Sequence, residues 1–358
     1  MANQYPSQGK FLPDSVVRIV SPIDDPEWDD RLATFPDASF FHGAGWAHVL
    51  KDTYGFQSAF FQSGDNCSPT ALLPICEIDS WLTGRRGVSL PFSDECTPLS
   101  LAACEFKKVY SAAFAHAKLR RWKYIECRGG RMLFGDVPSS TSFYGHSLKL
   151  TGGESHLFSD INASVRRAVR KSEQSGLTAS ISRDLDAVGE FYRLLCLTRR
   201  RHGMPVQPFS FFANIQKHVL ARKKGMVVLT KQGGVSVAGA MFFHFKGKAL
   251  YKFGASDERQ QHLRGNNLVM WEAIKWHACH GFSELDFGRT SLGNVGLRKF
   301  KNGWGATERL VDYVRYDFGA KRYVVVNDSA AGWHNHVFRR LPIFFSRIVG
   351  RVLYRHVA

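Results

Sequence analysis

The segment Leu-Asp-Phe-Gly-Arg at residues 285–289 is followed ten residues later by Lys-Phe-Lys-Asn-Gly-Trp-Gly-Ala at residues 299–306. Apolar residues at Ser283–Phe287 predict a buried strand, and the pattern at Val295–Asn302 predicts a short helix. A long closing strand is expected at Thr307–Phe318. Strand, helix and strand therefore follow one another around this segment.

The residues before this segment predict two helices, three antiparallel strands and a third helix. A short hairpin is expected at Gln232-Gly233-Gly234, between the first two strands. The helices are expected at Phe158–Ser175, Asp184–His202 and Asn266–His280, and the strands at Gly225–Lys231, Val235–Phe245 and Lys248–Ala255. This order of elements is that of a GNAT-type acyltransferase domain.

Strand-like and helix-like segments also alternate through the first part of the chain, so the whole chain is expected to be α/β. Its length of 358 residues favours two domains. The run Pro138–Ser142 marks the boundary region, and we place a first domain at residues 1–148 and a second at residues 149–320. Residues 321–358 form a tail.

Composition excludes several classes of protein. Hydrophobic residues make up 44% and charged residues 22% of the chain, which argues against disorder. The amino terminus lacks a secretory pattern, and no run of eighteen apolar residues predicts a membrane span. The seven cysteines contain no C-x-x-C pair and fit reduced thiols in a cytoplasmic protein.

The net charge of +17 is confined to the second part of the chain. Residues 1–150 hold 15 Lys and Arg against 16 Asp and Glu, a balance of −1. Residues 151–358 hold 33 against 15, a balance of +18. This asymmetry predicts a polyanionic partner for the second part: a nucleic acid, a phosphorylated substrate or an anionic membrane. A basic surface that serves solubility alone is the alternative.

The tail predicts a basic amphipathic helix. No acidic residue follows Asp328, whereas five arginines and three histidines do. Arginines fall on one side of a helical wheel and apolar residues on the adjacent face, with Pro342 at the helix start. Such a helix either binds a membrane surface or docks onto the chain's own body. The arginines are Arg340, Arg347, Arg351 and Arg355, and the apolar residues are Phe338, Leu341, Phe345, Ile348, Val349 and Val352.

Taken together, the motifs resemble the FemAB family of tandem GNAT-like proteins, also described as having a BioF2-like acetyltransferase domain. The resemblance spans roughly residues 15–318 and rests on the order and spacing of its motifs. Within the family, it is strongest for a subgroup associated with exosortase and exopolysaccharide systems. Besides the opening segment, the motifs lie at Trp46–Gly55, Ser89–Asp94, Thr198–Pro205, Tyr251–Ser256 and Asn266–Glu272. The resemblance implies two tandem GNAT-like domains with mixed, mostly antiparallel sheets flanked by helices.

The resemblance also implies transfer of an acyl or aminoacyl group to an amine of a cell-envelope precursor, related to peptidoglycan or exopolysaccharide. The donor would be an aminoacyl-tRNA, and the basic second part agrees with such a partner. No resident cofactor or metal is expected. The protein would act in the cytoplasm, with peripheral contact to an anionic membrane at the inner face as an open question.

The same resemblance places the lysine of the Phe-Lys pair, Lys301 after Phe300, at the reaction centre. An aminoacyl ester is already activated, so the protein has only to hold the amine in line and stabilise the developing oxyanion. The alternative for Lys301 is a solvated lysine on a short helix. Asp286 is a candidate proton acceptor or a partner for Arg289, with a structural salt bridge as its alternative.

Six further residues are candidates for substrate binding. Guanidinium and ammonium groups match phosphate oxygens, although Arg199 and Arg200 also fit a basic helix end that balances its own dipole. For Trp304 the alternative is packing in the core. The six candidates are Arg199, Arg200, Tyr251, Lys252, Arg289 and Trp304.

One stretch departs from GNAT enzymes that use acetyl-CoA, whose pyrophosphate loop reads Q/R-x-x-G-x-G/A. Here Gln261–Asn267 contains one glycine and ends in two asparagines. That loop is poor for CoA, although backbone amides at a helix start still favour an anion. An acyl-CoA-dependent N-acyltransferase is therefore the second hypothesis, and a non-catalytic RNA- or membrane-binding protein is the third.

Overall fold

The computed structural model describes residues 11–12, 15–65, 68–326 and 342–356. The chain forms two compact units. Unit 1 contains Met1–Ser142, Val311–Asp328 and Arg355–Ala358, and unit 2 contains Phe143–Leu310 and Ser329–Tyr354. The chain thus passes between the units more than once, instead of at one boundary.

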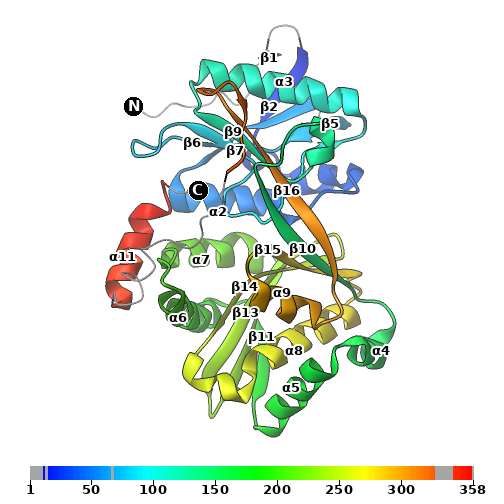
Figure 1. The fold of residues 1–358 in the computed structure, drawn as a ribbon, viewed down its shortest axis with the longest axis vertical. Coiled ribbons are helices and arrows are strands. Elements are labelled where there is room, and N and C mark those ends of the chain that lie inside the picture. The colour runs from blue at the N-terminus through cyan, green and yellow to red at the C-terminus, as the bar shows by residue number, and fades with distance from the viewer. Residues whose placement is uncertain (1–10, 13–14, 66–67, 327–341, 357–358) are drawn as a thin grey trace. The chain divides into compact units, whose positions relative to one another are not determined.

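Unit 2 is built around a sheet in which the strand order is β11-β12-β13-β14-β15-β10 (Figure 1). All neighbours are antiparallel except β14 and β15, which are parallel. The strands are β10 (Thr141–Lys149), β11 (Thr178–Ser182), β12 (Gly225–Gln232), β13 (Val235–Phe245), β14 (Lys248–Ser256) and β15 (Glu284–Ser291). The helices are α4 (Gly153–Asp160), α5 (Ala163–Gln174), α6 (Leu185–His202), α7 (Phe209–Ile215), α8 (Gly265–Cys279), α9 (Val295–Asn302) and α11 (Ile343–Leu353).

Helices α6 and α8 cover opposite faces of this sheet. Side chains alternate along β13: Ala238 and Ala240 belong to the core that includes α8, whereas a Cβ on Gly239 would lie 3.3 Å from Phe191 of α6. Trp304 and Val169 extend the α8 side of the core towards α9 and α5. Unit 2 therefore has helix, sheet and helix layers.

Unit 1 contains two sheets. In one the order is β1-β2-β4-β5-β8, and in the other the order is β16-β9-β7-β6-β3. Helix α3 packs on β4 and β5 through Phe106, Val109 and Ala113. Its elements are β1 (Phe11–Leu12), β2 (Ser15–Val20), α1 (Trp28–Arg31), α2 (Ala44–Tyr54), β3 (Gln57–Ser58), β4 (Phe60–Gly64), β5 (Pro69–Leu73), β6 (Cys76–Ile78), β7 (Arg86–Val88), β8 (Leu99–Ser100), α3 (Ala103–Leu119), β9 (Tyr124–Arg128), β16 (Thr307–Asp317) and β17 (Arg322–Tyr323).

Several predicted elements are confirmed within one or two residues. Asp184 caps α6 by accepting a hydrogen bond from the Ala187 amide at 2.7 Å, and α9 spans the predicted residues. The β12–β13 turn uses Gly233 and Gly234, both at positive φ, as a two-residue hairpin requires. The predicted tail helix forms from Ile343, with Pro342 at its start, whereas Phe338, Arg340 and Leu341 lie outside the described residues.

Other elements differ from expectation. The helix predicted at Phe158–Ser175 is two helices, because the Asn162 amide donates to Gly303 O at 3.0 Å and α5 begins after that residue. The closing strand β16 was assigned to the second domain, yet its residues Tyr313–Asp317 pair with β9 of unit 1. The prediction of one boundary near residue 148 could not include this return of the chain.

A pair of buried histidines joins β13 to α8. His277 Nδ1 lies 2.6 Å from Ala273 O, which can only accept, so Nδ1 carries the proton. Nε2 of His277 lies 2.9 Å from Nε2 of His244, within hydrogen-bond distance. Burial lowers the pKa of His244 to about 3 and that of His277 to about 4, because a charged imidazole in this contact would lose both water and its hydrogen bond.

This pair predicts acid destabilisation. A depressed native pKa stabilises the fold above the unfolded pKa of 6.5, and this contribution falls as pH drops below 6.5. At about 1.4 kcal/mol per pH unit and per group, the free energy of unfolding should fall by roughly 2–4 kcal/mol between pH 6.5 and pH 5. Urea unfolding followed by fluorescence measures this, and the His244→Gln/His277→Gln variant should lose most of the slope. If the free energy of unfolding of that variant depended on pH as steeply as that of the wild type, the histidine pair would not be the cause.

Candidate functional site

The parallel pair β14–β15 of unit 2 opens after three residue pairs. Lys248 lies opposite Glu284, Ala249 opposite Leu285 and Leu250 opposite Asp286. Beyond Leu250, β14 continues along β13 to Ser256, whereas β15 pairs only with β10 among the described residues. The two strands therefore diverge, and Tyr251, Lys252, Gly288 and Arg289 follow the point of divergence.

A polar pocket of about 110 Å³ lies where β14 leads into α8. A Cβ on Gly265 would lie 3.0 Å from Thr230 Oγ1 and 3.1 Å from Ala238 Cβ, so the absence of a side chain lets α8 begin close to the sheet. The first-turn amides and the helix dipole favour an anion at this end. The residues lining the pocket are Val237, Ala238, Ser256, Asp257, Gln260, Gln261, Arg264, Gly265, Asn266 and Asn267.

Lys301 and Asp286 fix the backbone of β15 beyond the divergence. Lys301 Nζ donates to Gly288 O at 2.9 Å and to Arg289 O at 3.0 Å, and its side chain is buried. Asp286 Oδ1 accepts from the Gly288 amide at 2.6 Å. Gly288 has φ +66°, which glycine adopts readily. An ammonium group therefore lies directly against two peptide units next to the open strand pair.

The other predicted residues lie in different surroundings. Phe300 is partly buried and packs 6.2 Å from Trp304, ring to ring. Trp304 itself is fully buried in the core. A substrate-binding role for Trp304 requires an accessible side chain, whereas the ring is fully buried, and packing accounts for its position. Arg289 stacks 4.2 Å over the ring of Phe143.

The end of α6 is tied to the end of β14. Thr198 Oγ1 donates to Ser256 O at 3.1 Å and accepts from the Ser256 amide at 3.0 Å. The adjacent Arg199 is partly buried and lies 3.5 Å from Met204 Sδ, and Arg200 is also partly buried. The structure thus brings the start of the predicted arginine pair to the strand end that leads into the α8 pocket.

Tyr251 and Lys252 are on β14 where the pair opens. Tyr251 packs 5.5 Å from Phe242 and 6.3 Å from Phe287, measured between rings, and burial raises the pKa of Tyr251 to about 12. It therefore stays protonated at neutral pH. Lys252 Nζ lies 5.5 Å from the ring centre of Phe253. Both residues are partly exposed.

Sequence analysis missed His146, which lies on β10 at an irregularity in its pairing with β15. His146 is buried, and its Nε2 lies 3.2 Å from Glu308 Oε2. Burial, followed by the charge of Lys301, lowers the pKa of His146, so the ring is neutral at pH 7 and able to accept a proton. Arg298 holds Glu308 through two hydrogen bonds of 2.7 Å. No spacing motif identifies this histidine.

Unit 1 also contains a parallel strand pair, β7–β9, but its strands do not stand apart beyond the last residue pair. In β7–β9 the last parallel residue pair is Val88 opposite Glu126. After β7 the chain turns back on the end of β9: the Cys96 amide donates to Arg128 O at 2.7 Å, and Ser89 Oγ accepts from the Arg128 amide at 2.6 Å. The end of β9 is therefore hydrogen-bonded to the segment that follows β7, whereas in unit 2 β15 separates from β14 beyond Leu250.

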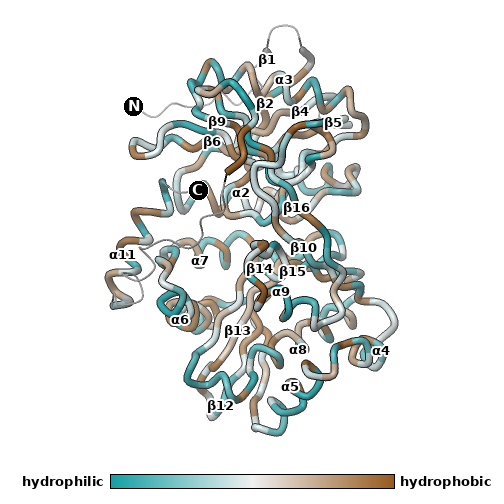
Figure 2. Tube along the Cα trace, in the orientation of Figure 1, coloured by the Kyte–Doolittle hydropathy of each residue, from teal (hydrophilic) through white to brown (hydrophobic). Residues whose placement is uncertain are grey.

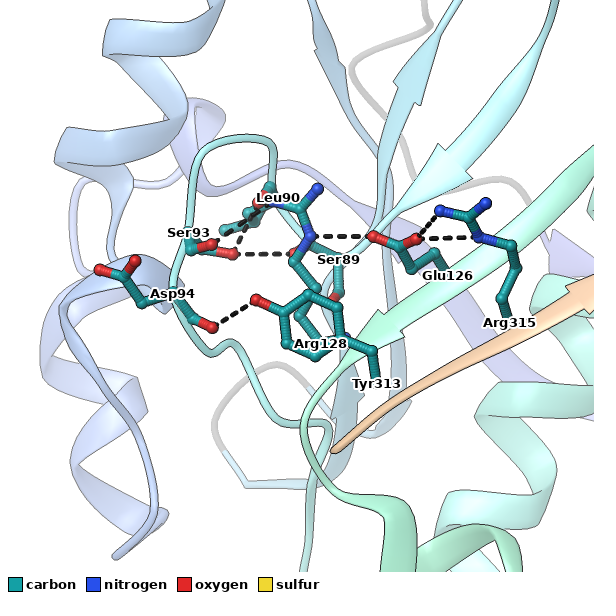
Figure 3. Close-up of polar contacts among 8 residues, drawn as sticks. All are labelled: Ser89, Leu90, Ser93, Asp94, Glu126, Arg128, Tyr313 and Arg315. Atoms are coloured by element: carbon teal, nitrogen blue, oxygen red, sulfur yellow. Dashed lines mark hydrogen bonds and ion pairs between the residues drawn. The ribbon is translucent and has the colours of Figure 1, made fainter. Parts of the chain in front are cut away.

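The side chain of Arg128 holds the segment after β7 against the end of β9 (Figure 3). Its guanidinium donates to Leu90 O at 3.2 Å, to Ser93 O at 3.4 Å and to Glu126 Oε1 at 3.0 Å. Glu126 also accepts from Arg315 at 2.9 Å. The charges of these two arginines hold the pKa of Glu126 below its usual value although burial opposes them. Unit 2 is consequently the better candidate for a donor site.

Two further findings bear on chemistry. Among the described residues, no group of three or more His, Cys, Asp and Glu could hold a metal ion. Within the same residues, no helix is both long enough and apolar enough to cross a bilayer.

Comparisons with known proteins bear on the fold. The family model described as an acetyltransferase (GNAT) domain matches residues 159–302. The crystal structure of FemX is similar with a TM-score of 0.63 at 14% identity, covering 79% of this chain and 94% of that chain. The fold is a tandem GNAT fold. The matched GNAT domain lies within unit 2.

Two other solved structures support the fold. A tandem GNAT protein from the clavulanic acid biosynthesis pathway has a TM-score of 0.54 at 11% identity and covers 84% of this chain and 98% of its own. L-PGS from Bacillus licheniformis has a TM-score of 0.52 at 14% identity, with 93% and 98% covered. A comparison with curated proteins gave no match.

Proposed function

We propose that this tandem GNAT protein is an acyltransferase that moves an activated acyl or aminoacyl group to an amine of a cell-envelope precursor, with its reaction centre at the open β14–β15 pair. The observation that carries the proposal is the contrast between the two parallel pairs. The pair in unit 2 opens next to a pocket at a helix start, whereas Arg128 closes the pair in unit 1.

The reaction demands little covalent chemistry from the chain. The neutral amine attacks the carbonyl carbon of the donor, the new amide bond forms, and the bond to the leaving hydroxyl or thiol group breaks. The proton lost by the amine ends on that leaving group. The chain has to align the reactants and stabilise the oxyanion, and the ammonium of Lys301 against Gly288 and Arg289 supplies positive charge in a buried setting.

A polyanionic donor such as aminoacyl-tRNA is favoured by the surface of unit 2. A groove of about 510 Å³ lies between α5 and α9, and Arg298 and Lys299 are among its lining residues. The exposed side of α5 adds Arg167, Arg170 and Lys171 (Figure 2, where α5 is largely teal). Closely spaced cations of this kind match a phosphate backbone. The residues that line the groove are Asn162, Ser164, Val165, Val295, Arg298, Lys299, Asn302 and Gly303.

An acyl-CoA donor is the second candidate, favoured by the position of the α8 pocket. A diphosphate there would meet the first turn of α8 and Arg264, and also the carboxylate of Asp257. Asp257 already accepts a hydrogen bond from the Arg259 amide at 3.0 Å, which offsets part of its charge. An acid next to the phosphate position makes CoA the weaker of the two donors.

The acceptor is inferred from likeness alone. The FemAB resemblance favours an amine on a peptidoglycan- or exopolysaccharide-related precursor. A likeness to a putative lysylphosphatidylglycerol synthetase points to a lipid-linked acceptor as well. Both donors are cytoplasmic molecules, so we place the reaction in the cytoplasm.

Thermal unfolding of the full chain tests the proposal. Acetyl-CoA, CoA, mixed aminoacyl-tRNA and deacylated tRNA are added one at a time. A ligand at 100 times its dissociation constant stabilises the native state by about 2.7 kcal/mol, which a melting curve resolves. Greater protection by aminoacyl-tRNA than by deacylated tRNA is the expected result. Protection by acetyl-CoA alone would select the CoA-dependent alternative, and protection by neither donor would contradict the proposed enzyme.

A further inference from the structure

Helix α11 docks on unit 2 with its small residues. Ser346 is buried, and a Cβ on Gly350 would lie 1.8 Å from Val206 O, so α11 approaches the backbone after α6 as closely as glycine allows. Tyr354 adds a hydrogen bond of 3.1 Å from its hydroxyl to Pro205 O. The sequence left open whether this helix binds a membrane surface or docks onto the chain's own body, and the structure shows it docked through its small residues.

The bulky apolar side chains of α11 are consequently exposed. Phe344, Phe345, Ile348 and Val352 have exposed fractions between 47% and 65%. Positions 344, 348 and 352 are four residues apart, so these side chains form one stripe along the helix. Figure 2 shows hydrophobic and hydrophilic residues mixed along α11. Four large apolar side chains on three helical turns are a costly surface to leave in water.

Arginines border this stripe. Arg347, Arg351 and Arg355 are exposed and also lie four residues apart, next to the apolar stripe. Nothing in residues 329–358 is acidic, so no carboxylate on this segment neutralises them. Two copies of α11 placed face to face would bring their arginines together, which disfavours a second copy as the occupant. An anionic surface with an apolar interior matches both stripes.

We propose that α11 is a membrane-docking helix: its small residues fix it to unit 2, and its stripe of Phe344, Phe345, Ile348 and Val352 inserts into an anionic bilayer surface. The flanking arginines contact lipid phosphates. This role is independent of the acyl group transferred.

Vesicle cosedimentation of the full chain tests this proposal. Phosphatidylcholine vesicles with about 30 mol% phosphatidylglycerol are compared with phosphatidylcholine alone. We expect tight binding to the anionic vesicles and at least about tenfold weaker binding by Phe344→Gln/Phe345→Gln, because two partly inserted rings are lost. The matched control is Leu119→Gln/Leu310→Gln, which removes two equally exposed leucines elsewhere. Arg351→Gln/Arg355→Gln should weaken binding more than Arg167→Gln/Arg170→Gln on α5.

Hydrogen exchange on the unmodified chain keeps the test independent of any variant. Anionic vesicles should slow exchange in residues 342–356, with no change in α3. The proposal is overturned if the phenylalanine variant binds vesicles as the wild type does, or if both pairs of variants weaken binding equally. It is also overturned if sedimentation shows a wild-type dimer that Phe344→Gln/Phe345→Gln converts to a monomer.

Discussion

Replacing Lys301 with methionine is expected to lower the turnover number of acyl transfer by about 10²–10³-fold, the usual cost of removing one group that stabilises an oxyanion. Methionine keeps the volume and removes the charge. Because Gly288 O and Arg289 O then lose their donor, the free energy of unfolding should also fall by about 1–3 kcal/mol. Steady-state kinetics, with the donor that stabilises the protein in the thermal unfolding test, measure the turnover number. Urea unfolding measures the free energy of unfolding separately.

Lys299→Met is the matched control, since Lys299 is an exposed lysine on the same helix, two residues away. It should leave stability unchanged and affect the Michaelis constant for a polyanionic donor more than turnover. A Lys301→Met protein that loses stability but retains turnover would show that Lys301 only holds β15 in place. Full retention of biological activity would favour the non-catalytic RNA- or membrane-binding alternative.

Replacing Arg128 with methionine should destabilise unit 1 by about 3 kcal/mol, near the lower end of the range for breaking a buried ion pair. The change leaves Leu90 O and Ser93 O without their donor and leaves Glu126 with Arg315 as a partner. That remaining partner is the reason for expecting the lower value. Urea unfolding measures the loss, and Arg315→Met, at a partly exposed position, should cost less.

The same Arg128→Met variant distinguishes two roles for unit 1. If the closed β7–β9 pair serves stability, donor affinity per folded molecule should equal that of the wild type. If donor affinity falls while the free energy of unfolding stays constant, Arg128 and its partners Glu126 and Arg315 bind a ligand. The assignment of the donor to unit 2 alone would then be wrong.

The order of elements in unit 2 was predictable because its signals are local. The Asp184 cap, the Gly233-Gly234 turn and the periodicity of α9 each lie within a few residues of the element that they define. The choice of Lys301 as a candidate for the reaction centre rests on the FemAB resemblance alone. The burial of Lys301 and its two carbonyl partners depend on the packing of α9 against β15, which no pattern of residues encodes.

Long-range pairing accounts for what the sequence did not reveal. The return of β16 to β9 joins residues almost two hundred positions apart, and β10 was not predicted as a strand. His146 was missed for this reason, since its chemistry arises from Glu308 on another strand and from burial. The helix predicted in the tail is present, but only packing decides which of its faces is exposed.

The most direct test of the central claim, that the donor binds at the open pair of unit 2, is a hydrogen-exchange footprint of the full chain. Exchange is compared with and without aminoacyl-tRNA, and with and without acetyl-CoA. We expect slower exchange at residues 251–256 and 286–289 with the donor that binds, together with residues 295–303 if it is aminoacyl-tRNA or residues 264–268 if it is acetyl-CoA. Residues 86–97 and 124–128 should be unchanged. Protection centred on residues 86–97 and 124–128 would contradict it and move the donor site to unit 1.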